Sequence, residues 1–162
     1  MFRETLAALC CSLGNGLNEN GVQNVTHTNS VFTKTDNGVR IKSRARASNN
    51  YATNINFRNL IMRNIANPIL IDQTYCPSNQ CPHQSVTYVH IRGTSRTEAA
   101  VRFDCSSSNP CRDQIAGHNT FHSLQSNSGN LYVTMLVGIV VALSSQEVVW
   151  GGRRNKLTRE LN

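Results

Sequence analysis

Residues 31–41 read VFTKTDNGVRI, and residues 61–71 read IMRNIANPILI. A shift of thirty residues brings apolar side chains onto apolar side chains in these two stretches, and it brings Asn37 onto Asn67. Self-similarity at a fixed period of this length is the sequence signature of repeat architectures. The matched pairs are Asn24 and Asn54, Val25 and Ile55, Asn29 and Asn59, Val31 and Ile61, Asn37 and Asn67, Val39 and Ile69, and Ile41 and Ile71.

The repeat continues into a third unit, where residues 86–88 (VTY) and 101–103 (VRF) follow 31 to 32 residues later. Each unit contains short alternating or β-branched runs separated by Asn, Gly, Ser and Thr, which is typical of strands and turns. A unit this small cannot bury its own apolar side, but stacked units form a continuous inner column. We therefore predict an all-β fold, a right-handed parallel β-helix of about four coils.

Asparagine recurs at matching positions of successive units, and two explanations stay open. Stacked side-chain amides can hydrogen-bond from one coil to the next. Asparagine also tolerates the left-handed backbone of tight corners and is common in ordinary turns. Both explanations give these residues an architectural role.

The composition describes one soluble globular domain with a basic surface. The 162 residues are 39% hydrophobic and 15% charged, and the net charge is +7. A basic protein favours polyanionic partners only in general terms. The sequence shows no helix-turn-helix, zinc-finger or aromatic-basic RNA-binding pattern, so we expect no nucleic-acid partner. The five histidines show no metal-site spacing, and we expect neither a metal nor a cofactor.

Four cysteines form two close pairs, Cys76 with Cys81 and Cys105 with Cys111, around loops rich in Pro, Ser and Asn. We favour disulfides over metal ligation or free thiols, since the spacing matches zinc sites poorly. Asn24 begins an Asn-Val-Thr glycosylation acceptor, which agrees with secretion. The apolar run near the N-terminus is shorter than the 7–15 residues of a signal-peptide core.

Several ordered motifs resemble one enzyme family. They are residues 35–43 (TDNGVRIKS), 67–77 (NPILIDQTYCP), 91–95 (IRGTS) and 100–105 (AVRFDC). Together they closely resemble the C-terminal half of plant polygalacturonases, glycoside hydrolase family 28, over residues 12–116. The resemblance implies a secreted cell-wall enzyme that cleaves the α-1,4-galacturonan of pectin by an inverting displacement on a parallel β-helix.

The resemblance implies substrate-binding roles for Arg40, Lys42 and Tyr75. Arg40 and Lys42 lie two apart, so in a strand they project from the same face, where both cations can bind uronate carboxylates. Tyr75 falls where the family places an active-site tyrosine. The competing interpretations are a solvated cationic face for the two cations and a half-buried structural tyrosine.

We expect that the chain retains none of the catalytic residues of the family that it resembles. An inverting glycosidase needs two carboxyl groups roughly 6.5–9.5 Å apart. The family supplies them from Asn-Thr-Asp and Asp-Asp motifs and adds a Gly-His-Gly histidine, none of which occurs here. Asp36 is out of register with Asp72, while Asp72 and Asp104 end matching strands. We expect an inactive truncated polygalacturonase-like chain, or alternatively a non-catalytic pectin-binding β-helix module.

The repeat pattern divides the chain into three parts. Residues 1–14 are interpreted as a remnant N-terminal segment, 15–116 as the partial β-helix, and 117–162 as a divergent tail. Within the tail, residues 118–130 are predicted to form a polar loop. The apolar run at residues 131–143 is shorter than the roughly 20 residues of a membrane span, so we predict a buried strand pair or hydrophobic tail rather than a membrane anchor. We expect a monomer whose partner is polygalacturonate.

Overall fold

The computed structural model describes residues 12, 13, 16, 18–43, 51–73, 83–104, 114–124, 132–135, 138–140 and 148–150. All of its regular elements in these ranges are β-strands, and neighbouring coils pair in parallel. The prediction of a parallel β-helix is confirmed.

The strands form two sheets. The five-stranded sheet has the order β1-β4-β6-β8-β13, with β1 (Ser12–Leu13), β4 (Asn37–Ser43), β6 (Asn67–Gln73), β8 (Val101–Asp104) and β13 (Val148–Trp150). The eight-stranded sheet comprises β2 (Val22–Thr28), β3 (Val31–Thr33), β5 (Tyr51–Ile65), β7 (His83–Ser95), β9 (Gln114–Gly117), β10 (Asn119–Ser123), β11 (Tyr132–Met135) and β12 (Gly138–Val140).

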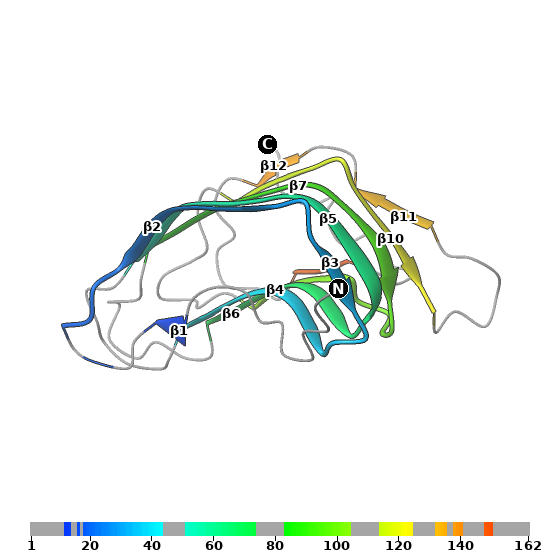
Figure 1. Cartoon of the computed structure of the whole chain (residues 1–162), viewed down its shortest axis with the longest axis horizontal. Helices are drawn as coiled ribbons and strands as arrows, with labels where there is room; N and C mark the ends of the chain where they lie inside the picture. The colour runs from blue at the N-terminus through cyan, green and yellow to red at the C-terminus, as the bar shows by residue number, and fades with distance from the viewer. Residues whose placement is uncertain are drawn as a thin grey trace, which may run out of the picture.

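The two sheets form opposite walls of an arch. In Figure 1, β2, β5 and β7 cross the top of the molecule and the chain then bends downward at one side, while β4 and β6 form the lower wall. The bend within β5 occurs near Asn59, which has a left-handed backbone with φ of 53°. One long strand therefore contributes to two facets of the same coil.

The register between coils follows the sequence repeat. Val31 pairs with Ile61 and Ile41 with Ile71, as the thirty-residue shift predicts. The third unit is also confirmed, since Val86 pairs with Ile55. Along the β5–β7 ladder the offset between paired residues falls from 32 at Ala52 and Gln84 to 31 at Ile55 and Val86, and to 30 at Ile65 and Ser95. The repeat therefore fixes which residues stack.

Apolar side chains of successive coils fill the space between the walls. Phe57 stacks on Tyr88 with ring centroids 5.6 Å apart, and Tyr88 lies 5.9 Å from Phe103 across the core. The Tyr88 hydroxyl is buried without a hydrogen-bond partner in the described part of the chain. Burial raises the pKa of this phenol well above its usual range, so it stays neutral. The core is therefore apolar in character even where it holds a tyrosine.

The recurring asparagines combine the two roles that the sequence left open. The Asn54 side-chain amide donates to Asn24 Oδ1 at 2.8 Å, and the Asn67 amide donates to Asn37 Oδ1 at 3.3 Å. Left-handed backbones occur at several of these corners, where a side-chain amide lowers the cost of positive φ. They are Asn24, Asn29, Asn54, Asn59 and Asn64, with φ between 53° and 58°.

The expectation of a polar loop at residues 118–130 is wrong for its first part. Strand β10 pairs in parallel with β7 and continues the fourth coil, whose preceding strand β9 also pairs in parallel with β7. Phe121 is only 1% exposed, and Asn119 is fully buried. The Asn119 amide donates to Tyr88 O at 3.0 Å, and its Oδ1 accepts from Ile91 N at 2.9 Å. A polar residue enters the core here because it satisfies backbone groups of the preceding coil.

Beyond the fourth coil the strand direction reverses. β11 and β12, within the apolar run, pair antiparallel with β10 and β9, and β13 pairs antiparallel with β8. The part of the run that the structure describes is therefore extended, as the strand interpretation predicted. No helix in the described ranges has the length and apolar character needed to span a membrane.

Candidate substrate-binding face

Strand β4 presents Arg40 and Lys42 on its outward face. Val39 and Ile41 are fully buried and Ser43 is 3% exposed, so these three side chains point into the core. Arg40 and Lys42 alternate with them, and Lys42 is exposed. The prediction that the two cations share a face is confirmed by this alternation.

The neighbouring strand β6 adds a carboxylate to this face. Asp72 lies in register with Lys42, but its side chain forms an ion pair with Arg40, through Asp72 Oδ2 and Arg40 Nη2. The exposed fractions of the two side chains are 25% for Arg40 and 16% for Asp72. Arg40 Nε is buried and has no hydrogen-bond partner in the described ranges. The guanidinium is therefore held from one side by the next coil.

Strand β8 of the third coil extends the rows of outward-facing side chains that begin on β4 and β6. Arg102 of β8 lies in register with Leu70, and Asp104 lies in register with Asp72. The backbones of Asp72 and Asp104 lie on adjacent strands, about 4.8 Å apart. Asp72 is already engaged by Arg40. The described face thus offers cations for an anionic ligand.

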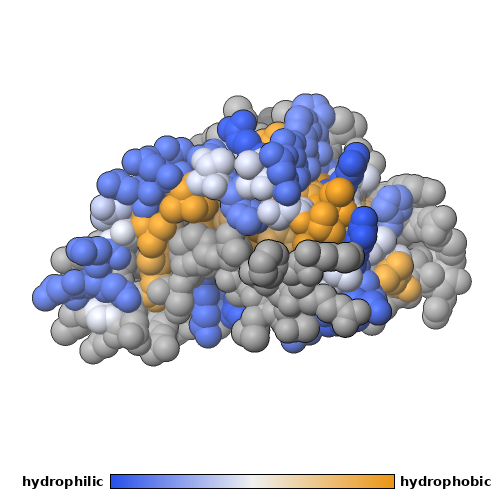
Figure 2. Space-filling view, viewed as in Figure 1, coloured by the Kyte–Doolittle hydropathy of each residue, from blue (hydrophilic) through white to orange (hydrophobic). Residues whose placement is uncertain are grey.

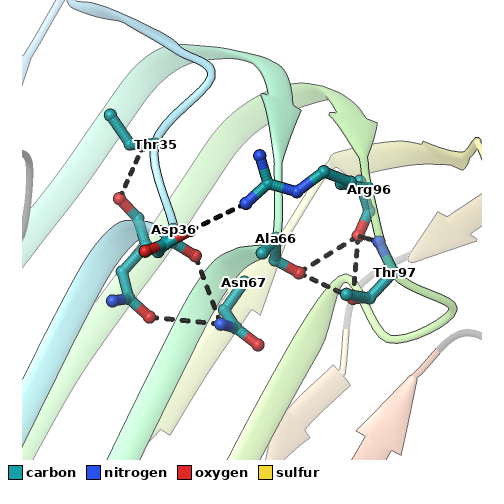
Figure 3. Close-up of polar contacts among 8 residues, drawn as sticks. Thr35, Asp36, Ala66, Asn67, Arg96 and Thr97 are labelled. Carbon is teal, nitrogen blue, oxygen red and sulfur yellow. Dashed lines mark hydrogen bonds and ion pairs between the residues drawn. The ribbon is translucent and has the colours of Figure 1, made fainter. Parts of the chain in front are cut away.

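A polar corner fixes where β4 and β6 begin. Arg96 of the third coil donates to Asp36 of the first coil at 2.7 Å, across the intervening second coil (Figure 3). The Asn67 side chain donates to Asp36 O at 3.2 Å, and Thr97 Oγ1 donates to Ala66 O at 2.6 Å (Figure 3). These bonds hold three successive coils in register just before the strands that carry the cationic face.

Asp72 is the partner that the sequence reading did not find. The thirty-residue shift alone places Asp72 beside Lys42, because their strands stack. The diagonal contact with Arg40 depends on side-chain direction, which the repeat does not encode. The presence of Asp72 one coil away from Arg40 could nevertheless have indicated that this carboxylate holds the arginine in place.

The structure describes only some of the other residues for which a site was predicted. Tyr75 and the four cysteines, Cys76, Cys81, Cys105 and Cys111, lie outside the described residues. Asn24 lies on β2, exposed, in the other sheet from Arg40 and Lys42, and its glycosylation stays a prediction. Among the residues that the structure describes, no three His, Cys, Asp or Glu side chains are grouped to hold a metal ion.

Comparison with known proteins identifies what the chain resembles. The profile of glycosyl hydrolases family 28 matches residues 10–135. The chain is 52% identical to a polygalacturonase from Prunus persica over 110 residues, covering 63% of this chain and 28% of that protein. It is 44% identical to a polygalacturonase from Persea americana over 115 residues, covering 66% and 25%.

An exopolygalacturonase from Platanus acerifolia is 37% identical over 114 residues, which are 65% of this chain and 30% of that relative. The chain therefore spans between a quarter and a third of the length of these relatives. No solved structure matches the chain.

Proposed function

The chain belongs to glycosyl hydrolases family 28, and we propose that it forms the uronate-binding part of a polygalacturonase-type cleft acting on the α-1,4-galacturonan of pectin. The observation that carries this proposal is the shared outward face of Arg40 and Lys42 on β4. The names of the similar proteins point to the same substrate class. We place the protein outside the cell, in the cell wall, on the same grounds.

The two cations have different parts in this proposal. A guanidinium can bind a carboxylate through two parallel N–H bonds, whereas an ammonium acts as a compact point charge. Asp72 engages one edge of the Arg40 guanidinium and limits its rotation. We propose that Arg40 orients one uronate of the substrate and that Lys42 attracts the same or the next uronate. Tyr75 is proposed as a third contact, by resemblance.

We further propose that this chain by itself binds galacturonan without hydrolysing it. The 162 residues contain no Asn-Thr-Asp, Asp-Asp or Gly-His-Gly motif. The carboxylates described on the cationic face, Asp72 and Asp104, are adjacent in register, and Asp72 is ion-paired with Arg40. This arrangement also favours the second candidate function, a pectin-binding β-helix module without catalysis.

The binding proposal is tested by NMR titration of the purified chain with a trimer of galacturonic acid. We expect amide shifts centred on β4 and an affinity at least about tenfold weaker for the Arg40→Gln/Lys42→Gln variant. The Arg153→Gln/Arg154→Gln variant loses the same charge elsewhere in the sequence and serves as the control. An equal loss in both variants would contradict a site on β4.

The proposal that the chain by itself does not hydrolyse galacturonan is tested by measuring the release of reducing ends from polygalacturonate. We expect no turnover above a reaction without protein, while the trimer still binds. Turnover comparable with that of the Prunus persica relative would show that this chain carries its own acid and base.

A further inference from the structure

The eight-stranded sheet differs from the five-stranded sheet in its charges. Its strands contain no Asp or Glu, and their cationic side chains, Arg58, Arg63 and Arg92, are all exposed. The five-stranded sheet mixes both signs, since Asp72 and Asp104 accompany its cations. Charges of one sign that are not offset locally create a positive surface potential, which attracts anionic ligands.

The three arginines lie on the outside of two neighbouring coils. Arg92 is in register with Ile61, so it lies diagonally from Arg63, at a backbone distance of about 8 Å from strand spacing and rise. Met62, between Ile61 and Arg63, is fully buried, which directs Arg63 outward. Arg58 lies on β5 just before the bend at Asn59. The arginines therefore follow the outer surface around one corner of the arch.

None of these arginines forms an ion pair within the ranges that the structure describes. The two ion pairs found there join Arg40 with Asp72 and Arg96 with Asp36. A guanidinium without a carboxylate partner keeps its parallel N–H donors available for a ligand. Figure 2 shows hydrophilic residues over the upper outside of the arch, and hydrophobic ones beneath them.

We propose that this outer surface, defined by Arg58, Arg63 and Arg92, is a second binding surface for polyuronate, on the wall opposite Arg40 and Lys42. The inference rests on the proposed function and extends it from one galacturonan contact to two. A polyuronate repeats a carboxylate at every sugar, so one chain can meet several guanidinium groups held on a rigid sheet.

The surroundings of the arginines favour a sugar polymer over a nucleic acid. Single-stranded nucleic acids are bound by exposed aromatic rings that stack on bases. The nearby phenylalanine and tyrosine rings, those of Phe57, Tyr88 and Phe121, are buried, and the exposed rings beside Arg92 are the imidazoles of His90 and His118. Val31, in register with Ile61, is 53% exposed and offers an apolar contact to a sugar ring.

The consequence is that one protein chain can hold two galacturonan segments. The two surfaces lie on different sheets of the arch, so a short oligomer reaches only one of them at a time. Both contacts include exposed charges, Lys42 on one surface and the three arginines on the other, so both should weaken as salt is added.

The test is an NMR titration of the full chain with a trimer of galacturonic acid, followed at both surfaces. We expect two independent sets of amide shifts, one on β4 and one on β5 and β7. The Arg58→Gln/Arg63→Gln/Arg92→Gln variant should weaken binding on β5 and β7 at least about tenfold, with the β4 affinity changed less than about twofold. Circular dichroism verifies that the variant keeps its fold.

The matched control is Arg153→Gln/Arg154→Gln/Lys156→Gln, which removes the same charge from other positions. It should leave both affinities within about twofold. Absence of shifts on β5 and β7, or an equal loss in the control, would overturn the second surface and leave the β4 proposal standing. Loss of the β4 shifts alone would overturn the proposed function instead. A single-stranded oligonucleotide of equal charge that binds the three arginines more tightly than the trimer would overturn the choice of polyuronate.

Discussion

Arg40 and Asp72 form an ion pair that joins two neighbouring coils on the outward face of the five-stranded sheet. Both side chains are largely shielded, with exposed fractions of 25% and 16%. Removing one member of a shielded pair leaves a charge with little solvent and no counterion. The pair should therefore contribute to folding as well as to the orientation of Arg40.

Asp72→Ala should lower the free energy of unfolding by about 1–2 kcal/mol, measured by urea denaturation. Asp36→Ala breaks the exposed pair with Arg96, in which the Asp36 side chain is 86% exposed, and is the control. We expect it to change the free energy of unfolding by less than about 0.5 kcal/mol. Equal losses in the two variants would show that shielding does not distinguish the pairs.

Gly93→Ala should be among the most destabilising single changes in the described coils. Gly93 has φ of 148°, and a Cβ there would lie 1.8 Å from Met62 O. We expect a loss of more than about 3 kcal/mol, because the backbone of a neighbouring coil has to move. Thermal unfolding measures the loss. Gly16→Ala is the control, since its nearest contact would be an ordinary 3.9 Å to Glu19 Cβ. A loss as large at Gly16 would contradict the steric explanation.

Tyr88→Phe should keep or raise stability, by up to about 1 kcal/mol in urea denaturation. The phenol is fully buried and its hydroxyl has no partner in the described part of the chain, so removing it also removes a desolvation cost. The stacking on Phe57 is kept. A loss of more than about 1 kcal/mol would reveal a bonded hydroxyl.

Asn119→Ala should lower the free energy of unfolding by about 2–4 kcal/mol. Its amide satisfies Tyr88 O and Ile91 N, and the variant leaves both backbone groups buried without a partner. Asn56→Ala is the matched control, because within the described ranges the Asn56 amide bonds only Asn54, through its O at 3.2 Å and its Oδ1 at 3.0 Å. We expect less than about 1 kcal/mol for the control, and similar losses in the two variants would contradict a special role for Asn119.

The sequence predicted the stacking of coils because a repeat of apolar residues records which side chains must share the core. Pairs such as Val31 with Ile61 are confirmed by the ladder. The same reasoning missed β10, because a single buried phenylalanine at Phe121 among polar neighbours gives no alternation long enough to recognise. The role of Asn119 was hidden for a related reason, since a buried asparagine and a turn asparagine have the same sequence signature.

The sequence could predict only those features of the cationic face that follow from the alternation of side chains along a strand. Alternation along β4 places Arg40 and Lys42 together. It does not determine that Asp72 bonds Arg40 rather than its register partner Lys42, because that choice depends on rotamers and shielding. The acid-free character of the eight-stranded sheet is visible in the sequence, but it acquires meaning only once its strands are known to share a surface.

The contact between Arg96 and Asp36 spans two coil boundaries, whereas the ladders described here join only adjacent coils. A stack held by nearest-neighbour contacts alone can lose its end coil without disturbing the rest. A bond from the first coil to the third adds a further contact that the departing coil must release. The pair is exposed, so this contact adds less than about 0.5 kcal/mol, and pulling from one end should break it together with the ladder between the first and second coils.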